Sequence, residues 1–496
     1  MRLLWLDISA SYSHSSLALP ALHSQLSGSN ESETKEYLFT VSRFTIKKDP
    51  FKALNEILIC NPDVVFATLW LFNSDFTLRI LRELKTLRSN VKIILGGPEF
   101  LGDNHIFLTD NNFVDAVFRG EGEEQFSLLL AALNSSSELI KIKGLCYINS
   151  KGNYVDNGIA YVSSFSSLNY PETSTFFNWE KPFIQIETSR GCFNHCSFCV
   201  SSACRKIENI SADEIRNRVE NACQKGVKNI RILDRTFNAD STRALKLLDV
   251  FSSFSNKICF HVELHPAMLS PALREKISSL PKDLLHIEAG IQSLDDAVLK
   301  ACKRKGNSKE SLDGLRFLTS LNKFTIHADL IAGLPLYTYD KLLEDLNTLI
   351  STGVDEIQLE LLKVLPGTSI RDDCDKYGIR YSSVPDYKVL ETSSVNSMDL
   401  YRLSILSKII DQWYNKGYFK NFLFKVAPAN KNFINDFLSY ILDKTSLDNT
   451  ISPEKRGSIL YNFCLKNHSD LTPLIKECWN EQGLSPKKYP GGDQND

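Results

Sequence analysis

The stretch RGCFNHCSFC, residues 190–199, places Cys192, Cys196 and Cys199 in the spacing C-x3-C-x2-C. The chain has 12 cysteines in 496 residues, so chance placement predicts only about 0.007 such triplets. Three thiolates can hold a cubane iron–sulfur cluster and leave one iron open to a substrate, whereas structural and electron-transfer clusters usually take four. A Cys3His zinc site, completed by His195 or a distant histidine, and a chance group of packed cysteines are the alternatives.

Alternating strand and helix patterns surround the three cysteines. Six apolar, strand-like segments have helical segments between them, at residues 183–188, 229–233, 258–263, 284–287, 325–330 and 356–361. Six βα units are fewer than the eight of a closed barrel, so we expect a partial (β/α)6 barrel. The cysteines follow its first strand and should lie at the carboxyl-end face, where barrel active sites are built. Ser211 and Glu214 form a capping-box pattern for the first helix.

The first 134 residues predict a doubly wound, Rossmann-like parallel sheet. Strands are expected at 3–8, 64–68, 92–95 and 116–119, and helices at 15–26, 50–60, 75–87 and up to residue 133. Ligands of such sheets bind at the carboxyl ends of the strands. Two glycine-rich turns lie there, at Gly96-Gly97-Pro98 and at residues 120–123, and the polar segment 27–36 is expected to be a loop.

These patterns give an α/β chain of four parts. Residues 1–134 form the N-terminal domain, 135–182 a linker and edge element with a strand-like run at 145–149, and 183–384 the partial barrel. Residues 385–496 are expected to be mainly helical, with helices at 401–414 and 430–442 and no strand.

Composition and charge exclude several classes of protein. The chain has 57 basic and 59 acidic side chains, and the balance predicts no dedicated nucleic-acid binder, which would need a basic face with interleaved aromatic residues. The sequence contains no stretch of about 18 uncharged apolar residues, so no transmembrane helix is predicted. The apolar N-terminus is too short for a signal peptide. We therefore expect a cytoplasmic protein with no membrane partner.

The three cysteines, with aromatic Phe198 directly before the third, resemble the signature of the radical S-adenosylmethionine (radical SAM) enzymes. That resemblance implies a [4Fe-4S] cluster held by Cys192, Cys196 and Cys199, whose remaining iron binds the amino and carboxylate groups of SAM. It also implies a reducing partner such as flavodoxin or ferredoxin, whose electron cleaves SAM to methionine and a 5′-deoxyadenosyl radical. Phe198 would help to shield the cluster from solvent.

Further positions in the barrel resemble a run in the oxygen-independent coproporphyrinogen oxidases of the same superfamily: GIQS at 290–293, Arg304, and DLIAGLP at 329–335. By this resemblance Gln292 and Asp329 would bond the SAM ribose hydroxyls. Arg304 would face the SAM carboxylate, and Gly333 would let the backbone approach the adenine.

Residues that follow the second, third and fourth barrel strands are candidates for the same site. Asp234 stands where the superfamily contacts the SAM amino group, although the usual Gly-Gly-Glu is absent; a helix cap is the alternative for it. Glu263, His265 and Glu288 would hold SAM, act as acid or base, or form structural salt bridges.

The N-terminal domain resembles that of the cobalamin-binding radical SAM class, in the turns LGGPE (95–99) and RGEGEE (119–124) and in YSHSSLAL (12–19). The segment 359–368 resembles the passage into a C-terminal domain of unknown function found in one subgroup. This implies bound cobalamin, with Gly96 and Gly97 close to the corrin or its nucleotide tail. The Asp-x-His-x-x-Gly motif of proteins that ligate cobalt through histidine is absent, and His14 is either an axial ligand or structural.

Together these resemblances imply a radical SAM enzyme that abstracts a hydrogen atom from a small-molecule or macromolecular substrate and, in its methyltransferase form, transfers a methyl group through methylcobalamin. One alternative is a radical SAM enzyme without corrin. Another is a non-enzymatic iron–sulfur electron carrier or sensor, which needs no ribose or carboxylate site. The unpaired spacing of five further cysteines predicts ordinary buried thiols, at Cys204, Cys223, Cys259, Cys302 and Cys374.

Overall fold

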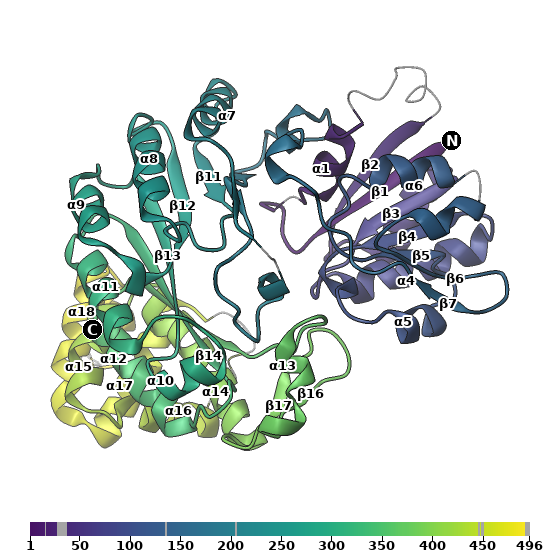
Figure 1. Ribbon diagram of the computed structural model, residues 1–496. Coiled ribbons are helices and arrows are strands. Elements are labelled where there is room, and N and C mark those ends of the chain that lie inside the picture. The colour runs from purple at the N-terminus through teal and green to yellow at the C-terminus, as the bar shows by residue number, and fades with distance from the viewer. Residues whose placement is uncertain are drawn as a thin grey trace.

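The computed structural model describes residues 1–14, 16–26, 37–133, 136–203, 206–444, 447 and 451–491, so the loop expected at 27–36 lies outside the described residues. Two β-sheets, each with helices around it, lie side by side (Figure 1). One belongs to the N-terminal domain and the other to the barrel. The C-terminal helices pack on the last barrel strand and its helix.

The N-terminal sheet has seven strands in the order β2-β1-β3-β4-β5-β6-β7. The strands from β2 to β5 are parallel, and the last two are antiparallel. Such an order reverses between β1 and β3, which marks the ligand-binding edge of doubly wound sheets. The bounds are β1 (Arg2–Ser9), β2 (Leu38–Thr45), β3 (Val64–Thr68), β4 (Lys92–Gly96), β5 (Ala116–Phe118), β6 (Leu145–Ile148) and β7 (Tyr154–Asp156).

Helices cover both faces of this sheet, because successive residues of its strands point to opposite sides. Leu3 and Trp5 pack with one set of helices, α1 (Ala18–Ser24) and α6 (Phe126–Ala132). Leu4 and Leu6 pack with the other, α3 (Pro50–Cys60), α4 (Ser74–Leu87) and α5 (His105–Asp110). Asp49 caps α3 by accepting from Lys52 N at 2.9 Å, which confirms the predicted helix start.

The barrel sheet has six parallel strands in chain order, from β8 to β15, and its two end strands do not pair in the described chain. The predicted partial barrel is therefore confirmed. Its strands are β8 (Ile184–Ile186), β11 (Asn229–Ile232), β12 (Cys259–Leu264), β13 (Leu285–Gln292), β14 (Thr325–Ala332) and β15 (Glu356–Leu361). Its helices are α7 (Ala212–Gln224), α8 (Ser241–Ser252), α9 (Pro271–Ser279), α10 (Asp296–Ala301), α11 (Ser308–Ser320) and α12 (Tyr339–Ser351). The capping box of Ser211 and Glu214 is present at the start of α7.

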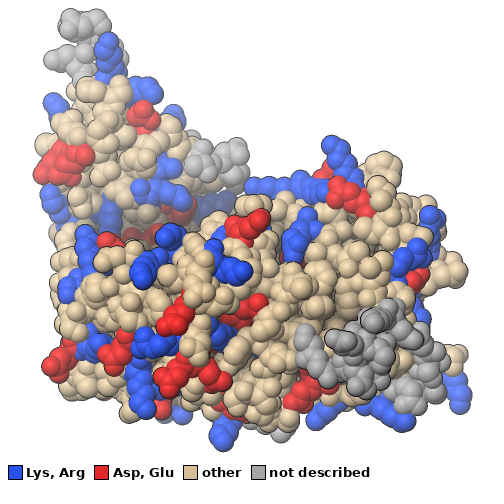
Figure 2. All heavy atoms as spheres, turned by 90° about the horizontal axis from the view of Figure 1, so that it is seen from above, with Lys and Arg blue, Asp and Glu red and all other residues tan. Residues whose placement is uncertain are grey.

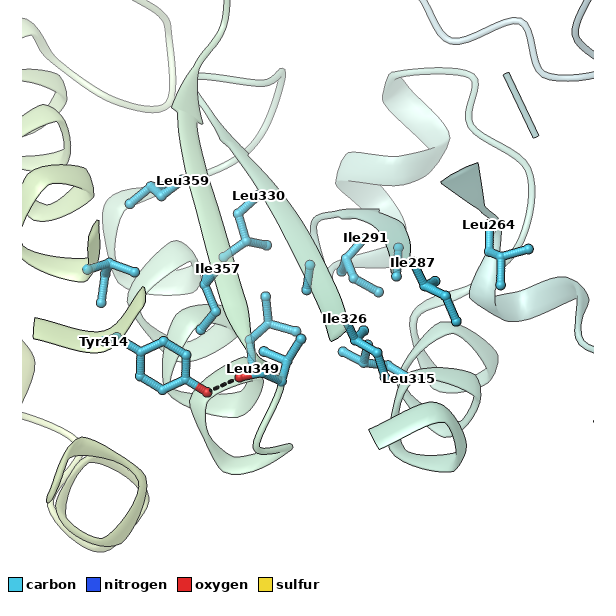
Figure 3. Close-up of a cluster of buried hydrophobic side chains, with 14 of the residues drawn as sticks. Leu264, Ile287, Ile291, Leu315, Ile326, Leu330, Leu349, Ile357, Leu359 and Tyr414 are labelled. Atoms are coloured by element: carbon cyan, nitrogen blue, oxygen red, sulfur yellow. Dashed lines mark hydrogen bonds between the residues drawn. The ribbon is translucent and has the colours of Figure 1, made fainter. Parts of the chain in front are cut away.

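The outward faces of the barrel strands form an apolar core against these helices. Figure 3 shows strand residues such as Ile287, Ile326 and Ile357 meeting Leu315 and Leu349 from the helices. Each such side chain contributes about 1.5–3 kcal/mol when fully buried. The C-terminal region joins this core through Tyr414, whose hydroxyl donates to Val354 O at 2.6 Å (Figure 3).

The C-terminal region is mainly helical, as expected, and a six-residue π-helical segment at Ile410–Asn415 follows its first long helix. The expectation of no strand after residue 385 is wrong: β17 (Val389–Glu391) pairs with β16 (Arg380–Tyr381) in a short antiparallel hairpin. The helices are α13 (Ser369–Asp372), α14 (Ser397–Ile409), α15 (Lys420–Ala429), α16 (Phe433–Lys444), α17 (Pro453–Asn467) and α18 (Thr472–Glu481).

The placement of charged and apolar residues in the fold agrees with what the composition predicts. Basic and acidic side chains are interspersed over the face seen in Figure 2. Among the described residues, no helix has both the length and the apolar character needed to cross a bilayer.

Candidate functional site

Residues 187–203, here called the cysteine loop, begin directly after β8 and are held to the barrel by Asp234. The carboxylate of Asp234 is fully buried and accepts from Thr188 N and Ser189 N at 2.8 Å each, and from Thr188 Oγ1 at 2.5 Å. Arg243 pairs with it at 3.2 Å. The helix-cap interpretation of Asp234 is wrong, because Asp240 caps α8. The carboxylate of Asp234 therefore serves to anchor the loop.

The three thiols of the loop lie at the carboxyl-end face of the barrel. Cys196 is buried, whereas Cys192 and Cys199 are half-buried. Arg304 Nη1 lies 3.8 Å from Cys196 Sγ, and Thr236 Oγ1 lies 3.9 Å from Cys192 Sγ. Burial raises the pKa of Cys196 and Arg304 opposes this, while the charges of the other two thiols raise it further. Cys192 and Cys199 thus both lie close enough to Cys196 for their charges to act on it.

The donor set of this loop is three thiols, the number that leaves one iron of a cubane cluster open. Among the described residues, no three His, Cys, Asp or Glu side chains are placed to share one metal ion. Each thiolate of a cubane cluster binds a different iron, so its donors lie farther apart than those around one zinc. His195 is exposed, and its Nδ1 lies 3.5 Å from Ser202 O within the same loop. The contact of His195 is thus with a backbone oxygen of the loop, whereas the Cys3His alternative would need it beside the thiols.

Gln292 ends β13, and Asp329 lies in the second half of the neighbouring strand β14; both present polar atoms that the protein does not use. Gln292 Oε1 and Asp329 Oδ1 are buried without a hydrogen-bond partner among the described residues. Leaving such atoms unpaired costs roughly 1–3 kcal/mol each. Burial, with the nearby charges of Glu288 and Glu263, raises the pKa of Asp329 to about 7. The pair is therefore prepared to bind hydrogen-bonding groups of a ligand.

Backbone geometry and neighbouring charge mark the same place. Gln292 has a φ of +69°, and a left-handed non-glycine residue is strained by about 1–3 kcal/mol, which is most often seen at functional sites. Arg304 donates to Gly290 O, so its guanidinium lies between this strand end and Cys196. The structure thus brings Gln292, Asp329 and Arg304 together beside the cysteine loop.

Two other predicted residues have structural roles as well. Gly333 has a φ of +84°, and a β-carbon there would lie 2.8 Å from Val389 Cγ1 and 3.4 Å from Leu400 Cδ2. Its lack of a side chain therefore serves the packing of β17 and α14 on the barrel. Phe198 is half-buried against the barrel core.

The remaining candidates, Glu263, His265 and Glu288, are either ion-paired or buried. Glu288 pairs with Arg231 at 2.7 Å and with His261 at 3.0 Å, so the salt-bridge interpretation holds for it. Burial raises the pKa of Glu263. Burial also lowers the pKa of His265 to about 4, with Nε2 3.0 Å from Lys305 O.

The thiols outside the cysteine loop are only partly as expected. Cys302 is buried, but Cys223, Cys259 and Cys374 are half-buried, and Cys204 lies outside the described residues. Cys302 O accepts from Ser197 N at 2.9 Å, so this residue also braces the loop.

A cavity of about 470 Å³ lies between the two domains, within the size range of small-molecule sites. One wall consists of strand ends of the N-terminal sheet, including Gly96 and Gly97. The other consists of the cysteine loop, including Arg190, Gly191 and Ser201. Such a position at the carboxyl ends of parallel strands is the one predicted from the sequence.

The two predicted glycines shape this cavity in different ways. A β-carbon on Gly96 would meet only Phe118 Cβ, at 3.9 Å, so glycine there leaves open space for a ligand. Gly97 has a φ of +111°, and its β-carbon would lie 2.5 Å from Leu69 O, so the backbone itself requires glycine. His14 does not line the cavity; it is exposed and bonds Ser11 Oγ at 2.8 Å.

Sequence reasoning missed the ion cluster in the wall of this cavity. Arg190 pairs there with Glu187 of the same loop and with Glu121 and Glu123 of the N-terminal domain. In the sequence, Arg190 is marked only by its place two residues before the first cysteine of the motif. Its partners in the N-terminal domain lie far away in the chain.

Comparisons with known proteins agree with this architecture. A model of the B12 binding domain matches residues 35–130, a model of the radical SAM superfamily matches residues 186–349, and a model of a protein of unknown function (DUF4080) matches residues 375–480. The chain is 23% identical over 332 residues to an uncharacterized methyltransferase of Pyrococcus horikoshii, a match that covers 62% of this chain and 69% of that protein. It is 25% identical over 308 residues to a tRNA-2-methylthio-N(6)-dimethylallyladenosine synthase of Vesicomyosocius okutanii, covering 59% of this chain and 65% of that protein.

Among solved structures, the fold is similar to that of the cobalamin-dependent S-adenosylmethionine radical enzyme OxsB with aqua-cobalamin and S-adenosylmethionine bound. The TM-score is 0.66 at 15% sequence identity, over 97% of this chain and 81% of that one. The chain is therefore an enzyme of the radical SAM superfamily, in which a B12-binding domain precedes the radical SAM domain and a DUF4080 domain follows it.

Proposed function

We propose that this chain is a cobalamin-dependent radical SAM methyltransferase with a [4Fe-4S] cluster, SAM and cobalamin as cofactors. The cavity carries the proposal, because strand ends of the B12-binding domain and the cysteine loop form opposite walls of one space. The similarity to a protein named as a methyltransferase and to a structure that holds aqua-cobalamin and SAM supports it. When bound, the cluster and SAM supply a radical that abstracts hydrogen, and cobalamin supplies a methyl carrier.

The residues of the chain divide the work of binding. Cys192, Cys196 and Cys199 would bind the cluster as thiolates, and binding it would release their protons. Phe198 would keep water from that side of the cluster. Arg304 places a permanent positive charge 3.8 Å from Cys196 Sγ, which favours the thiolate and suits a ligand carboxylate.

Gln292 and Asp329 would bind the ribose diol of SAM through their unpartnered oxygens. A diol donates two hydrogen bonds, and two acceptors on adjacent strands match this need. Asp234 would act through the loop backbone that it holds, and Gly333 through the packing that keeps the end of β14 in place. Gly96 and Gly97 would let the corrin approach the backbone of the N-terminal domain.

The test is anaerobic purification from cells supplied with cobalamin, followed by measurement of iron, sulfide and corrin per chain. Product analysis after addition of SAM and a reductant then measures 5′-deoxyadenosine and transfer of label from methyl-labelled SAM. We expect corrin and cluster together, and loss of cluster and of SAM cleavage in Cys196→Ala. The matched control is Cys223→Ala, a half-buried thiol on α7 outside the loop, which should keep both.

The alternatives predict different results in the same experiment. Cluster and SAM cleavage without corrin would identify a radical SAM enzyme that lacks cobalamin. A cluster whose spectrum does not respond to SAM would identify a carrier or sensor. Retained SAM cleavage in Cys196→Ala would refute the assignment of the cysteine loop.

A further inference from the structure

Arg190 stands directly before Gly191 and Cys192 and binds carboxylates of both domains. Its Nε and Nη2 donate to Glu187 at 3.0 and 2.7 Å, in the bidentate geometry that suits a guanidinium. Its Nη1 lies 2.9 Å from Glu123 and 3.5 Å from Glu121. One side chain therefore connects the cysteine loop to the turn that follows β5.

That turn forms part of the wall of the cavity. Residues 120–123 line the cavity, as does Arg190 itself. Glu121 is further fixed by Val162 N, which donates to its Oε2 at 2.7 Å. Gly120, at a φ of +104°, has Ala160 so close that no β-carbon would fit. A ligand that contacts this turn therefore contacts a rigid element, and this element is ion-paired with Arg190 of the cysteine loop.

The charges of this group are not balanced, since three carboxylates surround one guanidinium. Burial raises the pKa of Glu121, and the charges of Glu123 and Glu187 raise it further, while Arg190 opposes them. The guanidinium keeps its proton at any ordinary pH. If Glu123 lost its charge, Arg190 would still be paired with Glu187, so the loop would stay anchored while its strongest link to the other domain was lost.

We propose that Arg190 is a positioning residue that couples the occupant of the cavity to the cysteine loop through Glu121 and Glu123. This rests on the proposed function, which places cobalamin in the cavity and the cluster on the loop. A loaded cluster would hold the loop in one position, and Arg190 would then hold the rigid turn against it through Glu121 and Glu123. Cobalamin then meets a wall that is already organised and binds more tightly. By reciprocity, cobalamin favours the arrangement of the loop that holds the cluster. A salt bridge that only stabilises the fold would produce no such dependence.

The test measures the Kd of hydroxocobalamin in full-length protein with and without a reconstituted cluster. We expect the cluster to tighten binding at least about fivefold in the wild type, the lower end of typical coupling between sites. In Glu123→Gln the ratio should fall to near one, and in Arg190→Lys, which keeps the charge but loses the fork, it should also fall. The control is Glu124→Gln: Glu124 is the next residue of the turn, accepts from Ser163 N at 2.7 Å, and should keep the wild-type ratio.

The iron and sulfide content of each reconstituted variant shows that the loop still folds, and Glu123→Gln, which changes no residue of the loop, carries the test if Arg190→Lys loads poorly. An unchanged ratio in Glu123→Gln would overturn the inference alone, as would a wild-type ratio of one. A wild type that binds no hydroxocobalamin would overturn the proposed function and the inference with it.

Discussion

The anchoring of the cysteine loop by Asp234 predicts a large effect from a small substitution. In Asp234→Asn, the remaining oxygen still accepts from Thr188 N and Ser189 N, which both bond Oδ1. The new amide replaces Oδ2, so Arg243 loses its counter-charge and faces a donor. Breaking a buried pair in this way costs about 3–5 kcal/mol. We expect about 3 kcal/mol, the lower end of that range, because Arg243 keeps two hydrogen bonds to Thr188.

The assay is urea unfolding of the cluster-free protein followed by tryptophan fluorescence, together with iron content after reconstitution. Asp234→Asn should lower both the unfolding midpoint and the iron per chain, because the same loop carries the cysteines. Asp240→Asn is the matched control: Asn and Asp cap helices about equally well, so its midpoint should barely move. If the two variants had the same midpoint and iron content, the reasoning about the loop anchor would be refuted.

Three further predictions follow from the site. The pKa of Asp329, about 7, lies above the ordinary value, so the folded chain binds this proton more tightly than the unfolded chain and stability falls as pH rises toward 7. Urea unfolding of the cluster-free protein should therefore find Asp329→Asn more stable than the wild type at pH 8, by at most about 4 kcal/mol, and equal to it near pH 4; the same difference at both pH values would contradict this. Gly333→Ala should destabilise more than Gly417→Ala in the same assay, because both residues have a positive φ but only Gly333 would clash, with Val389; equal losses would exclude the clash. Gly96→Val should project a side chain into the cavity and weaken hydroxocobalamin binding at least tenfold, about 1.4 kcal/mol, at an unchanged urea midpoint; undiminished affinity would place the corrin elsewhere.

The barrel could be predicted because its strands are apolar on the side that faces the helices. Strands and helices also alternate regularly along the chain. The edge strand β2 could not be predicted, since its residues are mostly half-exposed and no clear apolar face marks them. The hairpin strand β17 has only three residues, too few for a period of two to appear. Strand β13 runs to Gln292, beyond the predicted end at 287, because polar and apolar residues alternate along it to the site.

Within the site, the sequence motifs predicted which residues gather but not how each is used. Gln292, Arg304 and Asp329 do meet beside the cysteine loop. The partners of Asp234 lie 45 and 46 residues earlier in the chain, and a carboxylate at a strand end looks the same whether it binds a ligand or a backbone amide. The ion pairs of Arg190 with the N-terminal domain likewise depend on how two domains pack, which no local pattern encodes.

The two anchors of the cysteine loop differ in strength, and the difference decides how the loop would respond to movement between the domains. Asp234 is fully buried, so no water can replace its bonds to the loop if they break. Arg190 and Glu121 keep part of their side chains exposed, at 19% and 25%, and water can compensate them. A shift of the N-terminal domain would therefore break the pair of Arg190 with Glu121 first and leave the loop with the barrel. The cysteines, Gln292 and Asp329 would thus stay together on the barrel, and the wall formed by the N-terminal domain is the side of the cavity that could move relative to them.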